Sequence, residues 1–341
     1  MKLVSYRIKV DEDPLHIQSL NERNLNMRLG WLTQGLVVDV GFAGQWLQLE
    51  KGLAFSHGLP TNMQTLLERG SDEIQRLQEV NRQMELEETS RLTVEGEPVA
   101  LRLDEVDLLA PLPQPKSVRD FYAFEQHVMT ARQRRGLAMI PEWYEIPVFY
   151  FTNHQSIIGH EAPVVKPEET QWLDYELEIA CIIGKKGRNI SEADAQSYIA
   201  GFTIMNDWSA RDLQRQEMAV GLGPAKGKDF ATSLGPCLVT LDELEDRRNG
   251  QHWDLRMTAK VNGQTISQGN VKDLYWSFSQ MIARASKDCD LYPGDVIGSG
   301  TVGTGCILEL GPEVHRWIES GDVIELEIER LGVLRNTITE A

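Results

Sequence analysis

Cysteine is scarce in this sequence, which has four cysteines among 341 residues. They are widely separated, and no two of them have the C-x-x-C spacing that is typical of zinc and thiol-redox sites. Segments such as EIACIIG and GTGCILEL place them in apolar surroundings. We therefore expect four reduced thiols of the protein core, at Cys181, Cys237, Cys289 and Cys306.

Long apolar runs are also missing. No uninterrupted apolar stretch approaches the length of a membrane span, and the first residues, MKLVSYRIKVDEDP, lack the apolar segment of a secretory signal. These absences indicate a soluble protein, and the cytoplasm is its expected location.

Positive charge is in deficit, because 34 lysines and arginines stand against 51 aspartates and glutamates, which gives a net charge of -17. Such a field repels nucleic acids and anionic membrane surfaces, so neither is an expected partner. It also repels a small anionic substrate at long range. A site for such a substrate therefore needs local cations or a metal ion.

The sequence divides at LLAPLPQPKSV (residues 108–118), because its three prolines cannot continue a helix or a central strand. We expect a small N-terminal module of short strands and helices at residues 1–110 and a catalytic domain at residues 116–341. In the module, Thr61 and Gln64 form a possible capping box before a helix that extends to Val80.

Short apolar runs separated by glycine, proline and aspartate turns dominate the second part and predict a β-rich core. The runs do not alternate regularly with helices, which favours a mixed α+β fold with a β-roll or barrel over a doubly wound sheet. Helices are expected from Ser191 to Gly201, after Asp207 and after Asp273. The run CILELG (residues 306–311) is expected to be a strand.

Two glutamates are candidates for a metal site. In LDYELEIACIIG a strand would place Glu176 and Glu178 on one face, about 7 Å apart along the chain. The second half of this strand is apolar on both faces, which is typical of a strand buried on both sides. Two adjacent buried carboxylates repel each other unless a proton or a cation is present. A solvated strand face, which fits VIELEIER (residues 323–330), is the alternative.

Asp207 ends the apolar run GFTIMN and precedes a helical segment that displays Arg211 and Gln214 on one side. The alternative is a helix N-cap whose carboxylate pairs with Arg211, and the residues alone leave both interpretations open. A site made of oxygen ligands favours Mg²⁺, with Mn²⁺ or Ca²⁺ as alternatives, because zinc and copper usually recruit histidine or cysteine.

These segments resemble the fumarylacetoacetate hydrolase family. LDYELEIACIIG is similar to its L-D-x-E-x-E metal strand, and MNDWSARDLQ (205–214) is similar to its second metal motif. Further similar segments are DFYAFEQH (120–127), PVFY (147–150), GKDFATSLGP (227–236) and GDVIGSGTVGTG (294–305). The resemblance covers about residues 115–335. It implies a mixed β-roll fold, a homodimer, and metal-dependent cleavage of β-diketo acids or a related reaction of oxo acids.

The resemblance also implies roles for individual residues. His127 falls on the general base that activates water, and Lys228 falls on a lysine beside the metal. The implied metal ligands are Asp120, Glu176, Glu178 and Asp207. The implied substrate contacts are Tyr122, Tyr150, Arg211, Gln214 and Thr301.

Two positions depart from the family pattern. An acidic residue that orients the base is expected after S-G-T, but VGTG continues into CILELG, where we expect no such carboxylate. Glu125 or Glu142 is expected to replace it. A family arginine that holds the substrate aligns near Arg135, although Gly136 takes the matching place.

The favoured function is a metal-dependent hydrolase that cleaves a carbon–carbon bond in a small 2,4-dioxo acid, such as an acylpyruvate or a fumarylacetoacetate-like compound. An oxo-acid decarboxylase, or an enol-keto isomerase or hydratase of the same family, is the alternative. A more remote one is a non-catalytic module that binds a metal and a small acid. No organic cofactor is expected, because G-x-G-x-x-G at Gly298, Gly300 and Gly303 lacks the βαβ context of a dinucleotide site.

Overall fold

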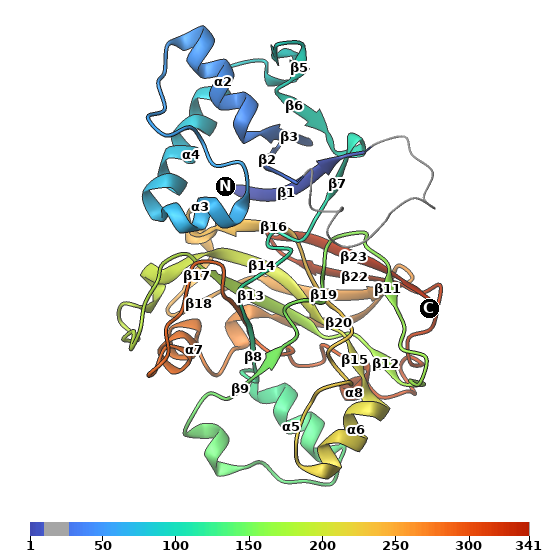
Figure 1. Cartoon of the computed structure of the whole chain (residues 1–341). Helices are drawn as coiled ribbons and strands as arrows, with labels where there is room; N and C mark the ends of the chain where they lie inside the picture. The colour runs from blue at the N-terminus through green and yellow to red at the C-terminus, as the bar shows by residue number, and fades with distance from the viewer. Residues whose placement is uncertain (10–26, 341) are drawn as a thin grey trace.

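The computed structural model describes residues 1–9 and 27–340 (Figure 1). Residues 10–26 of the expected N-terminal module lie outside this description. A large sheet runs through the centre of the molecule, with the helices of the module at one end and helices α5 (Glu125–Gln133) and α6 (Arg211–Val220) at the other. This strand-rich mixture of α and β structure confirms the fold class expected from the sequence.

The described residues of the N-terminal part, 1–9 and 27–110, form short strands and three α-helices. Its strands are β1 (Lys2–Ile8), β2 (Arg28–Thr33), β3 (Leu36–Asp39), β4 (Thr93–Val94), β5 (Glu97–Pro98), β6 (Ala100–Arg102) and β7 (Val106–Leu108). Its helices are α2 (Val40–Lys51), α3 (Met63–Arg69) and α4 (Ser71–Met84), with the 3-10 helices η2 (Thr89–Arg91) and η3 (Leu103–Glu105).

The remaining part is richer in strands. Those that build its two main sheets are β8 (Val118–Phe121), β9 (Phe149–Thr152), β10 (Ile157–Ile158), β11 (Val164–Val165), β13 (Leu177–Ile183), β14 (Ile199–Asp207), β16 (Thr232–Thr240), β19 (Arg256–Val261), β20 (Gln264–Asn270), β21 (Val296–Gly298), β22 (Val323–Ile328) and β23 (Gly332–Thr339). Short pairs are formed by β12 (Leu173–Asp174) with β15 (Ser209–Ala210) and by β17 (Arg248–Asn249) with β18 (His252–Trp253). Helices α7 (Phe278–Ala285) and α8 (Ile307–Leu310) complete it, with the 3-10 helices η4 (Pro141–Tyr144), η5 (Ala195–Tyr198), η6 (Leu241–Arg247) and η7 (Val271–Asp273).

The central sheet crosses the expected domain boundary. Its order in the described part of the chain is β6-β3-β2-β1-β16-β14-β13-β21-β8-β9, and it ends at β6 and β9 without closing into a barrel. Strand β1 joins the two parts, because it pairs with β2 on one side and with β16 on the other, where Leu3 lies opposite Leu238. The division near residues 110–116 stays a prediction.

Both faces of the central sheet are covered. On one face, Ala180 and Ile182 belong to a core shared with helices α2, α3 and α4. On the other face, Ile179, Cys181 and Ile183 belong to a core shared with the second sheet, whose order is β11-β23-β22-β19-β20. All residues of β13 are buried, which confirms the prediction of a strand covered on both sides.

The helix expected between Thr61 and Val80 is present but divided. Gly70, with a φ of 85°, separates α3 from α4, since this left-handed conformation suits glycine. The cap is also different from the expected one. The side chain of Asn62, rather than Thr61, accepts a hydrogen bond from the backbone N–H of Thr65 at the start of α3.

Three expectations for the second part need correction. Between Ser191 and Gly201 there is only η5, because β14 starts at Ile199 and pairing within the central sheet overrides helix propensity. The run CILELG contains α8 instead of a strand, because the Asp174 carboxylate accepts hydrogen bonds from the first two backbone N–H groups of this helix. The helix expected after Asp273 begins later, at Phe278, where Ser277 and Gln280 form a capping box.

The four cysteines are free, but only three are buried, so the expectation of four core thiols is wrong for Cys289, which is exposed. Within residues 1–9 and 27–340, no helix has both the length and the apolar character that crossing a membrane requires.

We expect Leu3→Ala to lower the free energy of unfolding by about 2–5 kcal/mol, the usual cost of deleting a buried leucine side chain. Leu3 is fully buried on β1, where the two parts of the chain share one sheet. Leu49→Ala is the matched control, because Leu49 is 68% exposed and its removal should change this free energy by less than about 0.5 kcal/mol. Urea unfolding followed by circular dichroism measures both, and equal effects would contradict the role of β1.

Candidate metal site and catalytic base

Four carboxylates from three strands converge at one point. Asp120 lies on β8, Glu176 immediately precedes β13, Glu178 lies within β13, and Asp207 ends β14. Each offers an oxygen, and these oxygens all lie within 4.8 Å of one another. The topology explains the convergence, because β13 and β14 are antiparallel neighbours and Gly298 of β21 connects β13 to Asp120 of β8. We call these four residues the carboxylate cluster.

Two buried cationic side chains contact the carboxylate cluster. The Lys228 ammonium donates to Glu176 Oε2 at 2.5 Å and to Asp207 Oδ2 at 2.6 Å. The Arg211 guanidinium lies 2.8 Å from Glu176 Oε1 through Nη2, and its Nε donates to Asp174 at 2.9 Å. Arg211 therefore does not pair with Asp207, and α6 begins at Arg211 itself. The helix N-cap interpretation of Asp207 is wrong.

The charges are not balanced within the cluster. Burial and the negative charge of Asp207 raise the pKa of Asp120 well above its usual value. Burial and the charge of Asp120 do the same to the pKa of Glu178. Burial also raises the pKa of Asp207, in spite of Lys228. Only Glu176 has a lowered pKa, because Lys228 and Arg211 together outweigh its burial.

A divalent cation fits this arrangement. In the part of the chain that the structure describes, the four carboxylates face only Lys228 and Arg211, and Arg211 is shared with Asp174, so at least two positive charges are missing when all four acids are ionised. Glu178 Oε2 and Asp207 Oδ1 are buried and have no hydrogen-bond partner among the described residues. Oxygen donors without partners in a buried, acidic position are what Mg²⁺ or another hard cation requires.

Four residues expected to contact substrate lie around the carboxylate cluster. The Tyr150 hydroxyl donates to Asp207 Oδ2 at 2.5 Å, and the Thr301 hydroxyl donates to Glu178 Oε1 at 3.3 Å. Gln214 accepts a hydrogen bond from Arg211 Nη1 at 3.2 Å. In this structure Tyr150, Thr301 and Arg211 thus hold carboxylates in place, and their contacts with substrate stay a prediction.

The glycine-rich loop approaches the cluster closely. A Cβ atom at Gly298 would meet Asp120 Oδ1 at 2.5 Å, and one at Gly300 would meet the backbone oxygen of Phe121 at 2.4 Å. The Gly300 N–H donates to Asp120 Oδ1, and the Thr304 N–H donates to Glu309 Oε2. These two N–H groups therefore bind carboxylates of the chain itself.

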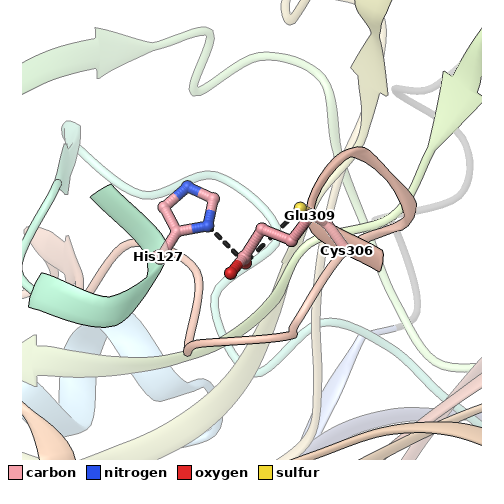
Figure 2. A group of neighbouring side chains, drawn as sticks. All are labelled: His127, Cys306 and Glu309. Atoms are coloured by element: carbon pink, nitrogen blue, oxygen red, sulfur yellow. Dashed lines mark hydrogen bonds and ion pairs between the residues drawn. The ribbon is translucent and has the colours of Figure 1, made fainter. Parts of the chain in front are cut away.

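His127 forms a buried pair with Glu309, whose Oε1 lies 2.5 Å from the imidazole Nδ1 (Figure 2). Glu309 lies on α8, inside the run CILELG, so the expectation that this run lacks an orienting carboxylate is wrong. The prediction of a strand at CILELG is the reason why sequence reasoning misses Glu309. The one signal in the sequence is an isolated acid within an apolar run.

The expected substitutes for this carboxylate are placed elsewhere. Glu125 accepts a hydrogen bond from the Tyr144 hydroxyl at 2.6 Å, and Glu142 is exposed on η4. The structure brings neither into the pair with His127. Tyr122 packs edge-on against the His127 ring at 5.3 Å, and burial raises the pKa of Tyr122 to about 12. Arg135 is exposed, and its positive charge opposes the effect of burial by lowering the pKa of Tyr122.

Comparisons with known proteins show the family and the fold of this chain. The C-terminal domain of fumarylacetoacetate (FAA) hydrolase matches residues 116–339. The human protein "Oxaloacetate tautomerase FAHD2A, mitochondrial" is 32% identical over 306 residues, which are 89% of this chain and 87% of that protein. The Xenopus laevis protein "Oxaloacetate tautomerase fahd2, mitochondrial" is 31% identical over 84% of this chain and 81% of its own.

Solved structures show the same fold. The fumarylacetoacetate hydrolase of Exiguobacterium antarcticum has a TM-score of 0.66 at 25% identity and covers 99% of this chain and 100% of its own. The maleylpyruvate hydrolase of Sphingobium has a TM-score of 0.65 at 20% identity, a likeness of fold alone. The fold and site define an enzyme with a buried acidic centre, and the chain belongs to the fumarylacetoacetate hydrolase family.

We expect Glu178→Gln to weaken Mg²⁺ binding by at least about tenfold. Mutation of residues that only hydrogen-bond to metal ligands already lowers metal affinity by about 10- to 100-fold. The metal-free variant should be as stable as the unchanged protein or more stable, because one of the repelling buried charges is removed. Isothermal titration calorimetry with chelator-treated protein measures the affinity. Glu327→Gln, on the exposed face of β22, is the matched control and should leave it unchanged. Equal affinities for both variants would remove Glu178 from the site.

Proposed function

We propose that this enzyme interconverts the keto and enol forms of a small 2-oxo dicarboxylic acid, with oxaloacetate as the first compound to test. The observation that carries the proposal is the buried carboxylate cluster, with a lysine inside it and a histidine–glutamate pair nearby. The names of the relatives that are 31–32% identical support this choice of substrate.

A divalent cation, Mg²⁺ or Mn²⁺, would be held by Asp120, Glu176, Glu178 and Asp207. When bound, such a cation draws electron density from the oxygens of a 2-oxo acid and so acidifies the neighbouring carbon. The net negative charge of the protein repels an anionic acid, so the place where the acid binds needs local positive charge. The divalent cation, Lys228 and Arg211 would supply this positive charge.

His127 would transfer the proton. The Glu309 carboxylate accepts a hydrogen bond from the Nδ1–H of the imidazole, which fixes the tautomer and leaves the Nε2 lone pair free to accept a proton from substrate. Return of this proton to the other end of the enol system would complete the interconversion.

Lys228 would stabilise the charge that develops on substrate oxygen. Its ammonium group has three N–H donors, and two of them are directed at Glu176 and Asp207. The third is available to an oxygen atom bound beside the carboxylate cluster. A donor already fixed in a buried position needs no reorganisation when the charge forms.

Hydrolysis of a carbon–carbon bond in a 2,4-dioxo acid is the second candidate. The His127–Glu309 pair favours it, because a histidine held by a buried carboxylate is also suited to activating a water molecule. The non-catalytic alternative depended on a missing orienting carboxylate, and Glu309 removes that argument. Decarboxylation of oxaloacetate is a further reaction to measure.

The homodimer and the cytoplasmic location remain predictions. The homodimer depends on the family resemblance alone. The names of the two relatives above assign those proteins to mitochondria, which does not support the cytoplasmic location.

Treatment with a strong chelator should abolish turnover, and Mg²⁺ or Mn²⁺ should restore it, because the carboxylates repel one another without a cation. The assay follows the ultraviolet absorbance of the oxaloacetate enol, with the uncatalysed rate subtracted. Decarboxylation of oxaloacetate and hydrolysis of an acylpyruvate are measured in parallel. Full activity of metal-free protein would contradict the proposal, and the fastest of the three reactions identifies the function.

His127→Gln should lower kcat by about 10²- to 10⁴-fold with little change in KM, since a general base contributes this much and the substrate is held by other residues. Glu309→Gln should also lower kcat, because glutamine cannot stabilise the charged imidazole. The matched control is His57→Gln, at an exposed position of the N-terminal part. Near-normal keto–enol turnover and hydrolysis in His127→Gln would exclude His127 as the base.

A further inference from the structure

A second cluster of side chains that could bind a metal ion includes the proposed catalytic base. His127, Cys306 and Glu309 each offer a ligand atom, and the three atoms all lie within 4.8 Å of one another. Figure 2 shows the imidazole and the thiol directed at the same carboxylate, with Cys306 Sγ 3.7 Å from Glu309 Oε1. Cys306 has no role in the function proposed above.

We propose that His127, Cys306 and Glu309 form a site for Zn²⁺ or a cation of similar softness, separate from the carboxylate cluster, and that occupation of this site switches off the base. An imidazole nitrogen, a thiolate and a carboxylate oxygen are three typical zinc ligands, and they leave a fourth position for water.

The distances require little rearrangement. Zinc bonds of 2.0–2.3 Å in a tetrahedral site separate neighbouring ligand atoms by about 3.3–3.8 Å. The separation between Cys306 Sγ and Glu309 Oε1 already has this value. The separation between His127 Nδ1 and Glu309 Oε1, now 2.5 Å, must increase by about 1 Å. The Thr304 N–H holds the other oxygen of Glu309 at 2.9 Å and keeps this carboxylate in place.

The charges also balance. Binding forms a Zn–S, a Zn–N and a Zn–O bond, and the proton of the Cys306 thiol leaves to solvent without any change of oxidation state. A dication, a thiolate, a carboxylate and a neutral imidazole sum to zero charge, which a buried position tolerates. His127 and Glu309 are only 5% and 4% exposed, and Cys306 is fully buried.

The two clusters would prefer different cations because their ligand atoms differ. The carboxylate cluster offers only oxygen atoms, which suit Mg²⁺, whereas a thiolate and an imidazole favour zinc and cobalt. Burial and the charge of Asp174 raise the pKa of the Cys306 thiol well above its usual value, so this thiol would become a thiolate only on binding a cation.

Inhibition follows from the tautomer of His127, and this consequence rests on the proposed function. A cation on Nδ1 takes the place of the proton through which this nitrogen donates a hydrogen bond to Glu309 in the free enzyme. That proton moves to Nε2, so the ring stays neutral and Nε2 can no longer accept a proton from substrate. Binding itself does not depend on which reaction the enzyme catalyses.

The first test adds Co²⁺ to the Mg²⁺-loaded protein and records its absorption spectrum. We expect a thiolate-to-cobalt charge-transfer band in the unchanged protein, its loss in Cys306→Ser, and its retention in the control Cys289→Ser. The absence of the band from the unchanged protein, or its persistence in Cys306→Ser, would overturn the site. Cys306→Ala serves as a second variant, and Mg²⁺ calorimetry confirms that each variant is folded.

The second test titrates Zn²⁺ into the Mg²⁺-dependent assay. Cys306→Ser should keep its basal activity and require at least about tenfold more Zn²⁺ for half-inhibition, the effect expected from a weakened metal site. Equal inhibition of both proteins would show that zinc acts at the carboxylate cluster and would overturn the proposed switch. A cobalt band in a protein inactive on all three substrates would support the site and contradict the proposed function.

Discussion

Repulsion among four buried carboxylates is the constraint on which this structure depends. Their oxygens lie within 4.8 Å of one another, where ionised acids stay charged only if cations or hydrogen-bond donors compensate them. Lys228, Arg211 and Tyr150 each supply part of this compensation, but Glu178 Oε2 and Asp207 Oδ1 have no partner in the described part of the chain. The fold therefore keeps an excess of negative charge in a buried position, and a bound divalent cation would balance it.

The carboxylates stay close together only if the strands that carry them cannot move apart. We call these strands and the parts that cover them the frame of the site. Strands β13 and β14 are buried along their whole length, and each presents apolar side chains to two cores. Moving Glu178 or Asp207 apart would expose this apolar surface or open the sheet, at a cost of about 25 cal/mol for every Å² exposed. The N-terminal part contributes by covering one of the two faces, although the residues of the carboxylate cluster all come from residues 120–207. Its pairing through β1 makes it part of the frame.

Several of these features could be predicted from the sequence because local pattern and tertiary environment agree. The apolar run after Glu178 indicated a strand buried on both faces, and the structure contains one. Prediction failed where tertiary contacts override local preference. Pairing within the central sheet shortens the helix expected after Ser191, and Asp174, more than 130 residues away, starts the helical turn that contains Glu309. No local pattern shows that a distant carboxylate will bind those N–H groups.

The segment from Gly298 to Glu309 connects the carboxylate cluster to His127, the proposed base. Its backbone N–H groups hold Asp120 at one end and Glu309 at the other, and the hydroxyl of Thr301 holds Glu178 between them. The separation between the cluster and His127 is therefore set by backbone geometry more than by flexible side chains. Glycines are needed here because a Cβ at Gly298 or Gly300 would collide with the residues that this segment positions. A cation bound at Cys306 and Glu309 would contact this same segment, whose Thr304 N–H already fixes one oxygen of Glu309.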